Sequence, residues 1–306
     1  MDKKLNIGGQ AVMEGVMIRS PKYYAVSVRK GKRIIVKKEK IKQHSSKLLK
    51  LPLIRGFVNL VQMLSLGMKT LMWSAEQAAD EEGAEISKGE YAFTILISVG
   101  MAVLFFIALP YLATQLIGFR EEQSPLIFNI IDGIIRIAVF LLYIISISRI
   151  KDIKRLFQYH GAEHMAVHCY EKGKKLTAEN VKKFPTLHPR CGTSFILIVL
   201  VMSIFVFSLV PPIILYFWPE FISYHIFARK GMLFLLRLLM LPLIAGISYE
   251  LLKLSDRHQR NFLVRAFIMP GLWLQMITTK KPDRGQIEVA IKSAQTVLSL
   301  EKQKNF

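Results

Sequence analysis

The sequence predicts a mainly α-helical, polytopic membrane protein with about four transmembrane helices, amphipathic interfacial helices and a small N-terminal β-hairpin. Composition is the first reason: 52% of the 306 residues are hydrophobic, yet 42 Lys and Arg against 22 Asp and Glu give a net charge of +20. Apolar and basic stretches must therefore alternate along the chain, as in membrane spans joined by basic loops. Nucleic-acid binding needs no long apolar segments, so we expect membrane lipids with anionic headgroups as partners and no nucleic acid. Protein partners are not indicated.

Four segments have the length and apolarity of membrane spans: residues 93–117, 127–147, 195–218 and 232–252. Charges inside them are few. Asp132 and Arg136 lie four residues apart in the second span, hence on one helical face, and Arg237 lies in the fourth. We expect Asp132 and Arg136 to neutralise each other inside the bundle, with a role in substrate passage as the alternative.

The remaining segments divide the chain into cytosolic and membrane parts. Lys and Arg accumulate before the first span, between the second and third spans, and after the fourth, whereas the connection 119–125 carries only Arg120. Positive residues mark the cytoplasmic side, so we expect a multi-pass protein with both termini and the loop 149–194 in the cytosol. The N-terminus has no apolar run of the kind found in a signal peptide. The predicted divisions are 1–50, 51–92, 93–148, 149–194, 195–252 and 253–306.

Smaller elements follow from local pattern. Two apolar runs flank Gly31 and predict the β-hairpin over residues 24–37. Residues 51–79 have apolar positions at helical spacing among polar ones, which indicates an interfacial or bundle-packed helix, followed by an acidic linker at Asp80, Glu81 and Glu82. The tail predicts a short apolar helix over 262–278, too short for a span, and an amphipathic helix over 283–300 with Asp283 as N-cap.

The most informative stretch is YHGAEHMAVHCYE at residues 159–171. His160, His164 and His168 follow one another at four-residue intervals, so a helix would place their imidazoles on one face. Two such histidines can each bring a ring nitrogen to about 2.0–2.1 Å from a zinc ion. Glu163, between them, is the candidate catalytic general base. The order His160-x-x-Glu163-His164 is that of the inverted zincins.

His188 and Cys191 lie at the far end of the same loop. Four of the seven histidines and both cysteines fall between residues 160 and 191, a concentration that core packing does not require. We therefore predict a divalent metal ion, zinc before iron or nickel, with three protein ligands: His160, His164 and either His188 or Cys191. His168 would be a fourth ligand or support the others. The alternative is a set of ordinary neutral imidazoles hydrogen-bonded to backbone. A disulfide is not expected on the cytosolic side.

The N-terminal motif offers a substrate- or anion-binding site. Backbone N–H groups of Gly8 and Gly9, followed by Gln10, can form an anion-binding concavity. Arg19 can grip a carboxylate or phosphate, and Glu14 can bind metal or act as a base. The alternative is a glycine turn with a buried Glu14–Arg19 ion pair.

One further carboxylate, Glu250, is a candidate metal ligand. Inverted zincins take a third ligand from a distant downstream glutamate, and Glu250 is a candidate, although we favour an interfacial carboxylate that is solvated or paired with Lys253.

These motifs resemble the YqhQ family of uncharacterised bacterial membrane proteins over nearly the whole chain. The resemblance rests on IGGQAVMEGVMIRSP at 7–21, YHGAEH at 159–164, HPRCGTS at 188–194, and PGLWLQ at 270–275 with Thr278 and Thr279. It implies a bacterial inner-membrane protein and a predicted metal-dependent enzyme, and it implies no particular substrate.

Three functional hypotheses follow. The first is a metal-dependent hydrolase at the cytosolic membrane face, with Glu163 as base and an anionic lipid or peptide as substrate. The second is a non-enzymatic membrane scaffold or regulatory protein with a structural metal site. The third, a transporter using Asp132, Arg136 and Arg237, is least favoured because the four spans show no inverted repeat.

Overall fold

The computed structural model describes residues 5–42, 46, 49, 51–78, 87–120, 123–257 and 261–303. The strands are β1 (Gly8–Val12), β2 (Gly15–Arg19), β3 (Tyr23–Lys30) and β4 (Arg33–Lys40). The helices are α1 (Ile54–Ala78), α2 (Lys88–Val103), η2 (Leu104–Ala108), α3 (Leu109–Leu116), α4 (Pro125–Ile147), α5 (Lys151–Glu171), α6 (Ala178–Val181), α7 (Gly192–Phe217), η3 (Pro219–Ser223), α8 (Ile226–Arg257), α9 (Phe262–Thr278) and α10 (Arg284–Lys302). The predicted mainly helical fold with a small N-terminal sheet is confirmed.

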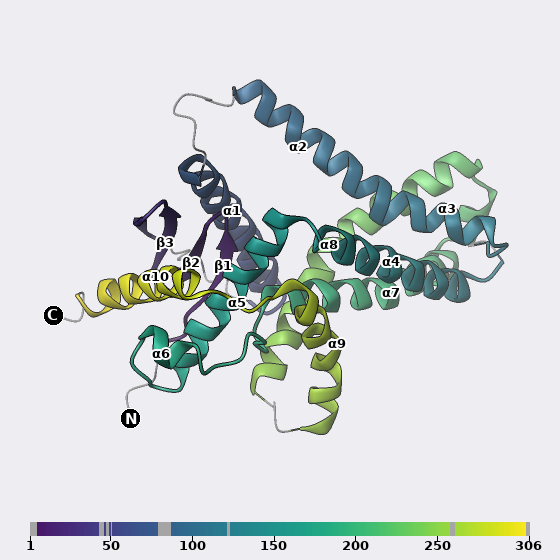
Figure 1. Ribbon diagram of the computed structural model, residues 1–306. Helices are drawn as coiled ribbons and strands as arrows, with labels where there is room; N and C mark the ends of the chain where they lie inside the picture. Colours follow the sequence, from purple (N-terminus) through teal and green to yellow (C-terminus); the bar gives the residue numbers. More distant parts are fainter. Residues whose placement is uncertain are drawn as a thin grey trace.

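Within the described part of the chain, four helices are long and apolar enough to cross a membrane: Ala92–Leu116, Pro125–Ile147, Gly192–Phe217 and Ile226–Leu254. They coincide with the four predicted spans. The first is one helical path through α2, η2 and α3. Its π-helical turn η2 ends two residues before Pro110, which cannot donate the regular helical hydrogen bond. In Figure 1, α3, α4 and α7 extend away from the end of the molecule where the sheet, α5, α6 and α10 gather.

Asp132 and Arg136, inside the second span, pair as expected. The Arg136 Nη2 atom donates to Oδ2 of Asp132 at 2.7 Å within α4, and both side chains are almost fully buried. Across the bundle, Nη2 of Arg237 lies 3.3 Å from Oδ1 of Asn129. The charges thus face protein and each other, which is the arrangement that makes a charge tolerable at membrane depth.

The sheet is larger than the predicted hairpin. Strands pair antiparallel in the order β1-β2-β3-β4. The predicted turn is present between β3 and β4, where Lys30 pairs with Arg33 and Gly31 has a φ of +57°. The glycine-rich motif adds a second hairpin, β1–β2. That hairpin has no clear alternation of apolar and polar residues, because both faces of the sheet are covered.

The two faces of the sheet have different neighbours. Met17, Tyr24 and Val26 pack toward α1, with Leu66, Leu71 and Trp73 against them. The alternate residues, among them Ile18 and Ala25, join the core formed by α5 and α10. The period of two along each strand therefore places α1 on one face and α5 with α10 on the other. Asp283 caps α10 in a capping box with Gln286, as its position predicts.

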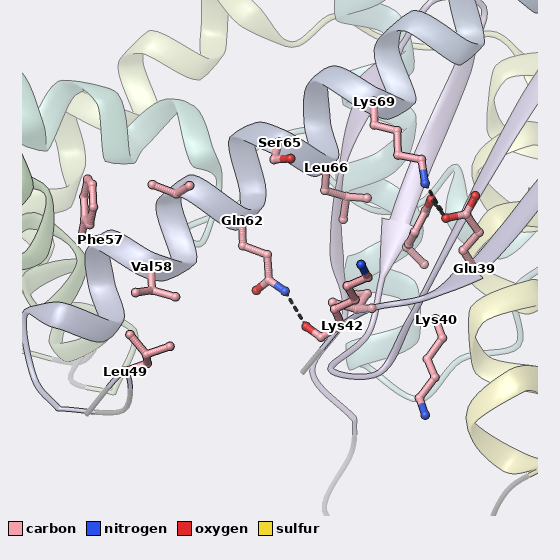
Figure 2. Close-up of a pocket in the computed structure, with 13 residues that line it drawn as sticks. Glu39, Lys40, Lys42, Leu49, Phe57, Val58, Gln62, Ser65, Leu66 and Lys69 are labelled. Carbon is pink, nitrogen blue, oxygen red and sulfur yellow. Dashed lines mark hydrogen bonds and ion pairs between the residues drawn. The ribbon is translucent and has the colours of Figure 1, made fainter. Parts of the chain in front are cut away.

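Helix α1 connects the membrane helices to the sheet. Near its start, Arg55 forms a two-pronged ion pair with Glu250 on α8, with N–O distances of 2.7 and 2.5 Å. Toward its end, Lys69 donates to Glu39 of β4 at 2.6 Å, and the Gln62 side chain donates to the Lys42 carbonyl at 3.0 Å (Figure 2). The predicted acidic linker at Asp80, Glu81 and Glu82 lies outside the described residues.

A glycine contact sets the distance between α1 and α8. A Cβ atom at Gly246 would lie 2.6 Å from the Leu53 carbonyl oxygen, and one at Gly56 would lie 2.9 Å from the Gly246 Cα. We expect Gly246→Ala to destabilise the protein by about 1–3 kcal/mol through overpacking, measured as a lower melting temperature in detergent. The control is Gly100→Ala on α2, where a Cβ meets nothing within 4 Å. Equal melting temperatures for the two variants would contradict this close helix contact.

Candidate metal centre

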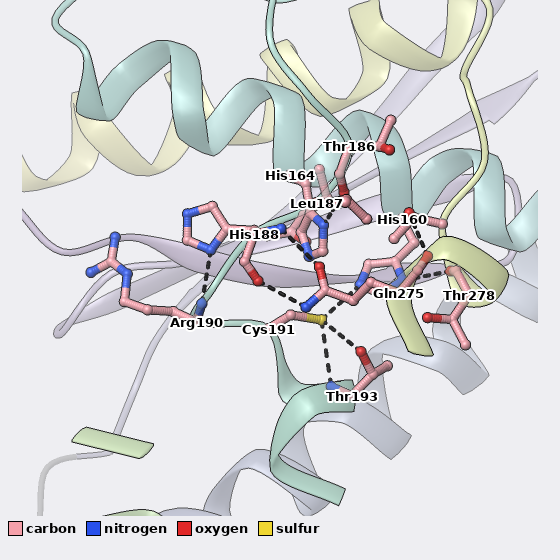
Figure 3. A network of polar contacts seen from close by, with 12 residues as sticks. His160, His164, Thr186, Leu187, His188, Arg190, Cys191, Thr193, Gln275 and Thr278 are labelled. Atoms are coloured by element: carbon pink, nitrogen blue, oxygen red, sulfur yellow. Dashed lines mark hydrogen bonds and ion pairs between the residues drawn. The ribbon is translucent and has the colours of Figure 1, made fainter. Parts of the chain in front are cut away.

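The predicted histidines meet at the sheet-side end of the membrane helices. Helix α5 carries His160, Glu163, His164 and His168, and the segment between α6 and α7 returns across it with His188 and Cys191 (Figure 3). The imidazole rings form a continuous row: centroid distances are 4.4 Å for His160 and His164, 5.6 Å for His164 and His188, and 4.4 Å for His188 and His168. The helical spacing along α5 aligns three of these rings, and His188, from the segment before α7, lies between His164 and His168.

Three donors form the group that we call the three-donor centre: His160, His164 and Cys191. One ligand atom from each lies within 4.8 Å of the others, so the group could hold a metal ion. The Cys191 Sγ atom is 3.3 Å from Nε2 of His160. His164 and Cys191 are buried, and His160 is partly buried.

The hydrogen bonds fix which ring nitrogens can bind a metal. Nδ1 of His160 donates to the Thr278 carbonyl at 2.9 Å, and Nδ1 of His164 donates to the Thr186 carbonyl at 2.5 Å. A carbonyl oxygen only accepts, so both ring protons are on Nδ1 and both Nε2 atoms keep an unprotonated lone pair, which in His160 faces the Cys191 Sγ. Metal-binding histidines commonly donate their other N–H to a backbone carbonyl in this way. The donor chemistry of the centre therefore fits a metal ion.

A second group is chemically different. His168, Glu171 and His188 also have ligand atoms within 4.8 Å of one another. However, Nδ1 of His188 accepts the Arg190 backbone N–H at 3.2 Å, so the ring proton is on Nε2, which faces Glu171 at 3.4 Å. Arg190 also forms an ion pair with Glu171. Both ring nitrogens of His188 are thus engaged, and of the two predicted third ligands Cys191 is the one placed beside His160 and His164.

Glu163 lies beside the three-donor centre. Its Oε2 atom is 3.5 Å from Nε2 of His164, the side chain is buried, and the backbone of Gly9 lies close enough to the carboxyl group to favour its charged form. The β1 strand therefore contacts the centre through Gly9. This position suits a group that exchanges a proton with a molecule bound at the centre.

Burial opposes charge on each of these groups. Desolvation raises the pKa of Glu163, raises the pKa of the Cys191 thiol to about 11, and lowers the pKa of His164 well below its usual value. Each shift favours the neutral form. A bound cation would offset this cost, because it stabilises a thiolate and a carboxylate directly.

Comparison with known proteins supports the family resemblance that the motifs indicate. The family described as "Protein of unknown function (DUF1385)" matches residues 51–300. The chain is 33% identical over 309 residues to the uncharacterized protein YqhQ of Bacillus subtilis (strain 168), covering 96% of this chain and 92% of that protein. The chain belongs to this family. No solved structure matches it. The descriptions of the DUF1385 family and of YqhQ name no reaction.

In this DUF1385 protein the paired glycines of the motif lie in strand β1, and the concavity predicted for Gly8 and Gly9 is extended backbone. The Gln10 side chain donates to the Gly67 carbonyl at 3.0 Å and to Thr70 Oγ1 at 3.1 Å. Gln10 thus ties β1 to α1. Of Gly8, Gly9 and Gln10, it is Gly9 that lies beside the Glu163 carboxyl group.

Glu14 and Arg19 do not pair with each other as the alternative expected. Glu14 occupies the β1–β2 turn with a φ of +50°, forms a two-pronged ion pair with Arg155, and accepts a hydrogen bond from the Tyr159 hydroxyl at 3.1 Å. Burial lowers the pKa of Arg19 at the end of β2. Glu14 therefore holds the start of α5 on the sheet. It does not lie in the three-donor centre.

Sequence reasoning gave no role to two residues of the DUF1385 site. Gln275, on α9, is fully buried; it accepts the His188 backbone N–H at 2.8 Å and donates to the His188 carbonyl and to Ser194 Oγ, both at 2.9 Å. A lone amide inside an apolar helix was the available signal. The second is Glu171, three residues after His168, which lies with His168 and His188 in the second donor group. Glu250 is bound by Arg55 and belongs to neither donor group.

Loss of Gln275 should loosen the segment that carries Cys191. Gln275→Leu leaves two buried backbone groups of His188 unpaired, so we expect a loss of about 1–3 kcal/mol of stability together with weaker zinc retention. The measurement pairs a melting curve with metal analysis of the purified protein. The matched control is Gln295→Leu, since Gln295 makes one exposed hydrogen bond to the Leu176 carbonyl. Unchanged stability and zinc content in Gln275→Leu would contradict this role.

Proposed function

We propose that this chain is a membrane-bound, metal-dependent hydrolase that acts at the cytosolic membrane face. The observation that carries the proposal is the three-donor centre, in which two unprotonated Nε2 atoms and one Sγ converge. Imidazole and thiolate ligands suit zinc. Three protein ligands leave one position open, which is the arrangement of catalytic rather than structural zinc sites.

The protein groups around the centre support hydrolysis. A zinc ion bound there would act as a Lewis acid and lower the pKa of water to about 7. Glu163, beside the Gly9 backbone, would accept a proton from the attacking water and return it to the leaving group. His188, Gln275 and Ser194 would hold the Cys191 segment in place through their hydrogen bonds.

The location of the centre supports a substrate at the membrane surface. Cys191 is the N-cap residue of α7, so the centre lies at the end of a helix apolar enough to cross the membrane. Lysines on α5 and in the segment after it, such as Lys154 and Lys174, are exposed on the same part of the chain. Basic surroundings of this kind attract anionic headgroups or acidic peptides, and the Lys and Arg distribution favours the cytosolic side.

A non-enzymatic scaffold with a structural metal ion is the second candidate. It is favoured by the deep burial of His164 and Cys191, which are 2% and 6% exposed. Closed, four-ligand zinc sites are typical of structural metal ions. The two functions therefore differ in whether a small molecule can reach the metal.

Binding of acetohydroxamate, a chelator of open zinc positions, separates the two candidates without knowledge of the substrate. The zinc-loaded full chain in detergent would be titrated by calorimetry, beside His160→Ala. A hydrolase centre predicts one-to-one binding that the His160→Ala variant loses. Zinc-loaded protein that binds no hydroxamate would contradict the hydrolase and favour the scaffold.

A further inference from the structure

A groove of about 550 Å³ lies between α1 and the end of β4, separate from the metal centre. The groove is on the α1 face of the sheet, whereas α5 and the three-donor centre are on the opposite face. Its volume lies within the range of small-molecule binding sites. The residues along its walls are Tyr24, Glu39, Lys40, Ile41, Lys42, Leu49, Phe57, Val58, Val61, Gln62, Ser65, Leu66 and Lys69.

One end of the groove is apolar and lies beside the membrane helices. Figure 2 shows Phe57 and Val58 at this end, on the first turns of α1. Phe57 and Val61 are 38% and 49% exposed. The same turns of α1 contact the last turns of α8 through Arg55 with Glu250 and Asn59 with Tyr249. These α8 residues lie at the end of the segment Ile226–Leu254, which is apolar enough to cross a membrane.

The other end of the groove is basic. Lys40, Lys42 and Lys69 are exposed there, against the single carboxylate of Glu39. Glu39 is bound by Lys69 at 2.6 Å and by the Tyr24 hydroxyl at 2.7 Å. The hydrogen bond from Gln62 to the Lys42 carbonyl fixes the end of β4 against α1. This hydrogen bond therefore fixes the position of the basic end of the groove relative to its apolar end.

We propose that this groove binds one anionic phospholipid of the bilayer. Its acyl chains would cover the apolar residues of α1 beside the span, and its phosphate would lie among the three lysines. The apolar end is the one beside the membrane helices, so a phospholipid entering from the bilayer would place its acyl chains there and its phosphate at the basic end. Lysines near a membrane surface attract anionic lipid, so three of them at one end of the groove favour a negatively charged headgroup. The site goes beyond the proposed hydrolase function and does not depend on it.

The test compares lipid retention in the full chain, purified in detergent and reconstituted into nanodiscs of phosphatidylglycerol and phosphatidylcholine. Native mass spectrometry counts each lipid bound. The Lys40→Gln, Lys42→Gln, Lys69→Gln triple variant should lose the preference for phosphatidylglycerol by about tenfold or more. The control triple variant, Lys22→Gln, Lys32→Gln and Lys292→Gln, removes the same charge from exposed positions outside the groove and should keep the preference.

A second variant keeps the test decisive if the triple variant fails to fold. Val61→Asp places a carboxylate on the apolar wall and should reduce retention of both lipids, while zinc content remains that of the wild type. Equal phosphatidylglycerol retention in the wild type and either groove variant would overturn the proposal. Displacement of the lipid by millimolar inorganic phosphate would also overturn it, because it would identify free phosphate as the ligand.

Discussion

His160→Ala, His164→Ala and Cys191→Ser are each expected to abolish the zinc content of the purified protein, which should be about one ion per chain in the wild type. Each change removes one of three donors whose ligand atoms lie within 4.8 Å of one another. Outer hydrogen-bonding partners of a metal site alone contribute roughly 10- to 100-fold to affinity, so loss of a direct ligand should cost at least that much. Elemental analysis by mass spectrometry measures the result.

His225→Ala is the matched control for the ligand variants. His225 is exposed and stacks on Phe227, with ring centroids 5.5 Å apart, just before α8 begins. It belongs to neither group of possible metal donors among the described residues. We expect this variant to retain zinc. Zinc retained at wild-type levels in the His160, His164 and Cys191 variants would place the metal elsewhere.

Glu163→Gln is expected to keep the metal and to lower hydrolysis by about 10²- to 10⁴-fold, because glutamine cannot accept the proton. Glutamine has the shape of glutamic acid and can occupy the same place beside the Gly9 backbone. Replacing a buried carboxyl group by a neutral amide should not destabilise the protein. The measurements are zinc content, melting temperature and the rate of metal-dependent hydrolysis.

The control for Glu163→Gln is Glu179→Gln on α6. Glu179 is exposed and pairs with Arg284 at 3.4 Å, so its loss should change neither metal nor turnover. If Glu163→Gln retains both full zinc and full turnover, Glu163 is not the base. A purely structural metal ion instead predicts no metal-dependent hydrolysis in the wild type or in either variant.

The membrane helices could be predicted because length and apolarity suffice. The spans 127–147 and 195–218 differ from α4 and α7 by only a few residues at each end. The hairpin at Gly31 could be predicted equally well, because a glycine between two apolar runs is a local turn signal, and the structure gives that glycine a positive φ. The β1–β2 hairpin was not, because Gly8 and Gly9 suggested a loop and both faces of the sheet are buried.

The candidate site was predictable where it depends on one helix. The four-residue spacing placed His160 and His164 together and Glu163 beside them. The choice between Cys191 and His188 depends on how the segment after α6 returns over α5, which no local pattern encodes. Gln275 holds that segment from 87 residues away, and Glu14 pairs with Arg155 across 141 residues. Such contacts are set by the tertiary fold.

X-ray absorption spectroscopy of the zinc-loaded full chain tests the three-donor centre most directly, because it reports the ligand atoms themselves. The structure predicts one sulfur at about 2.3 Å and two imidazole nitrogens at about 2.0–2.1 Å, with the sulfur lost in Cys191→Ser. A zinc shell of nitrogen and oxygen alone in the wild type, or a sulfur shell that persists in Cys191→Ser, would contradict the centre formed by His160, His164 and Cys191.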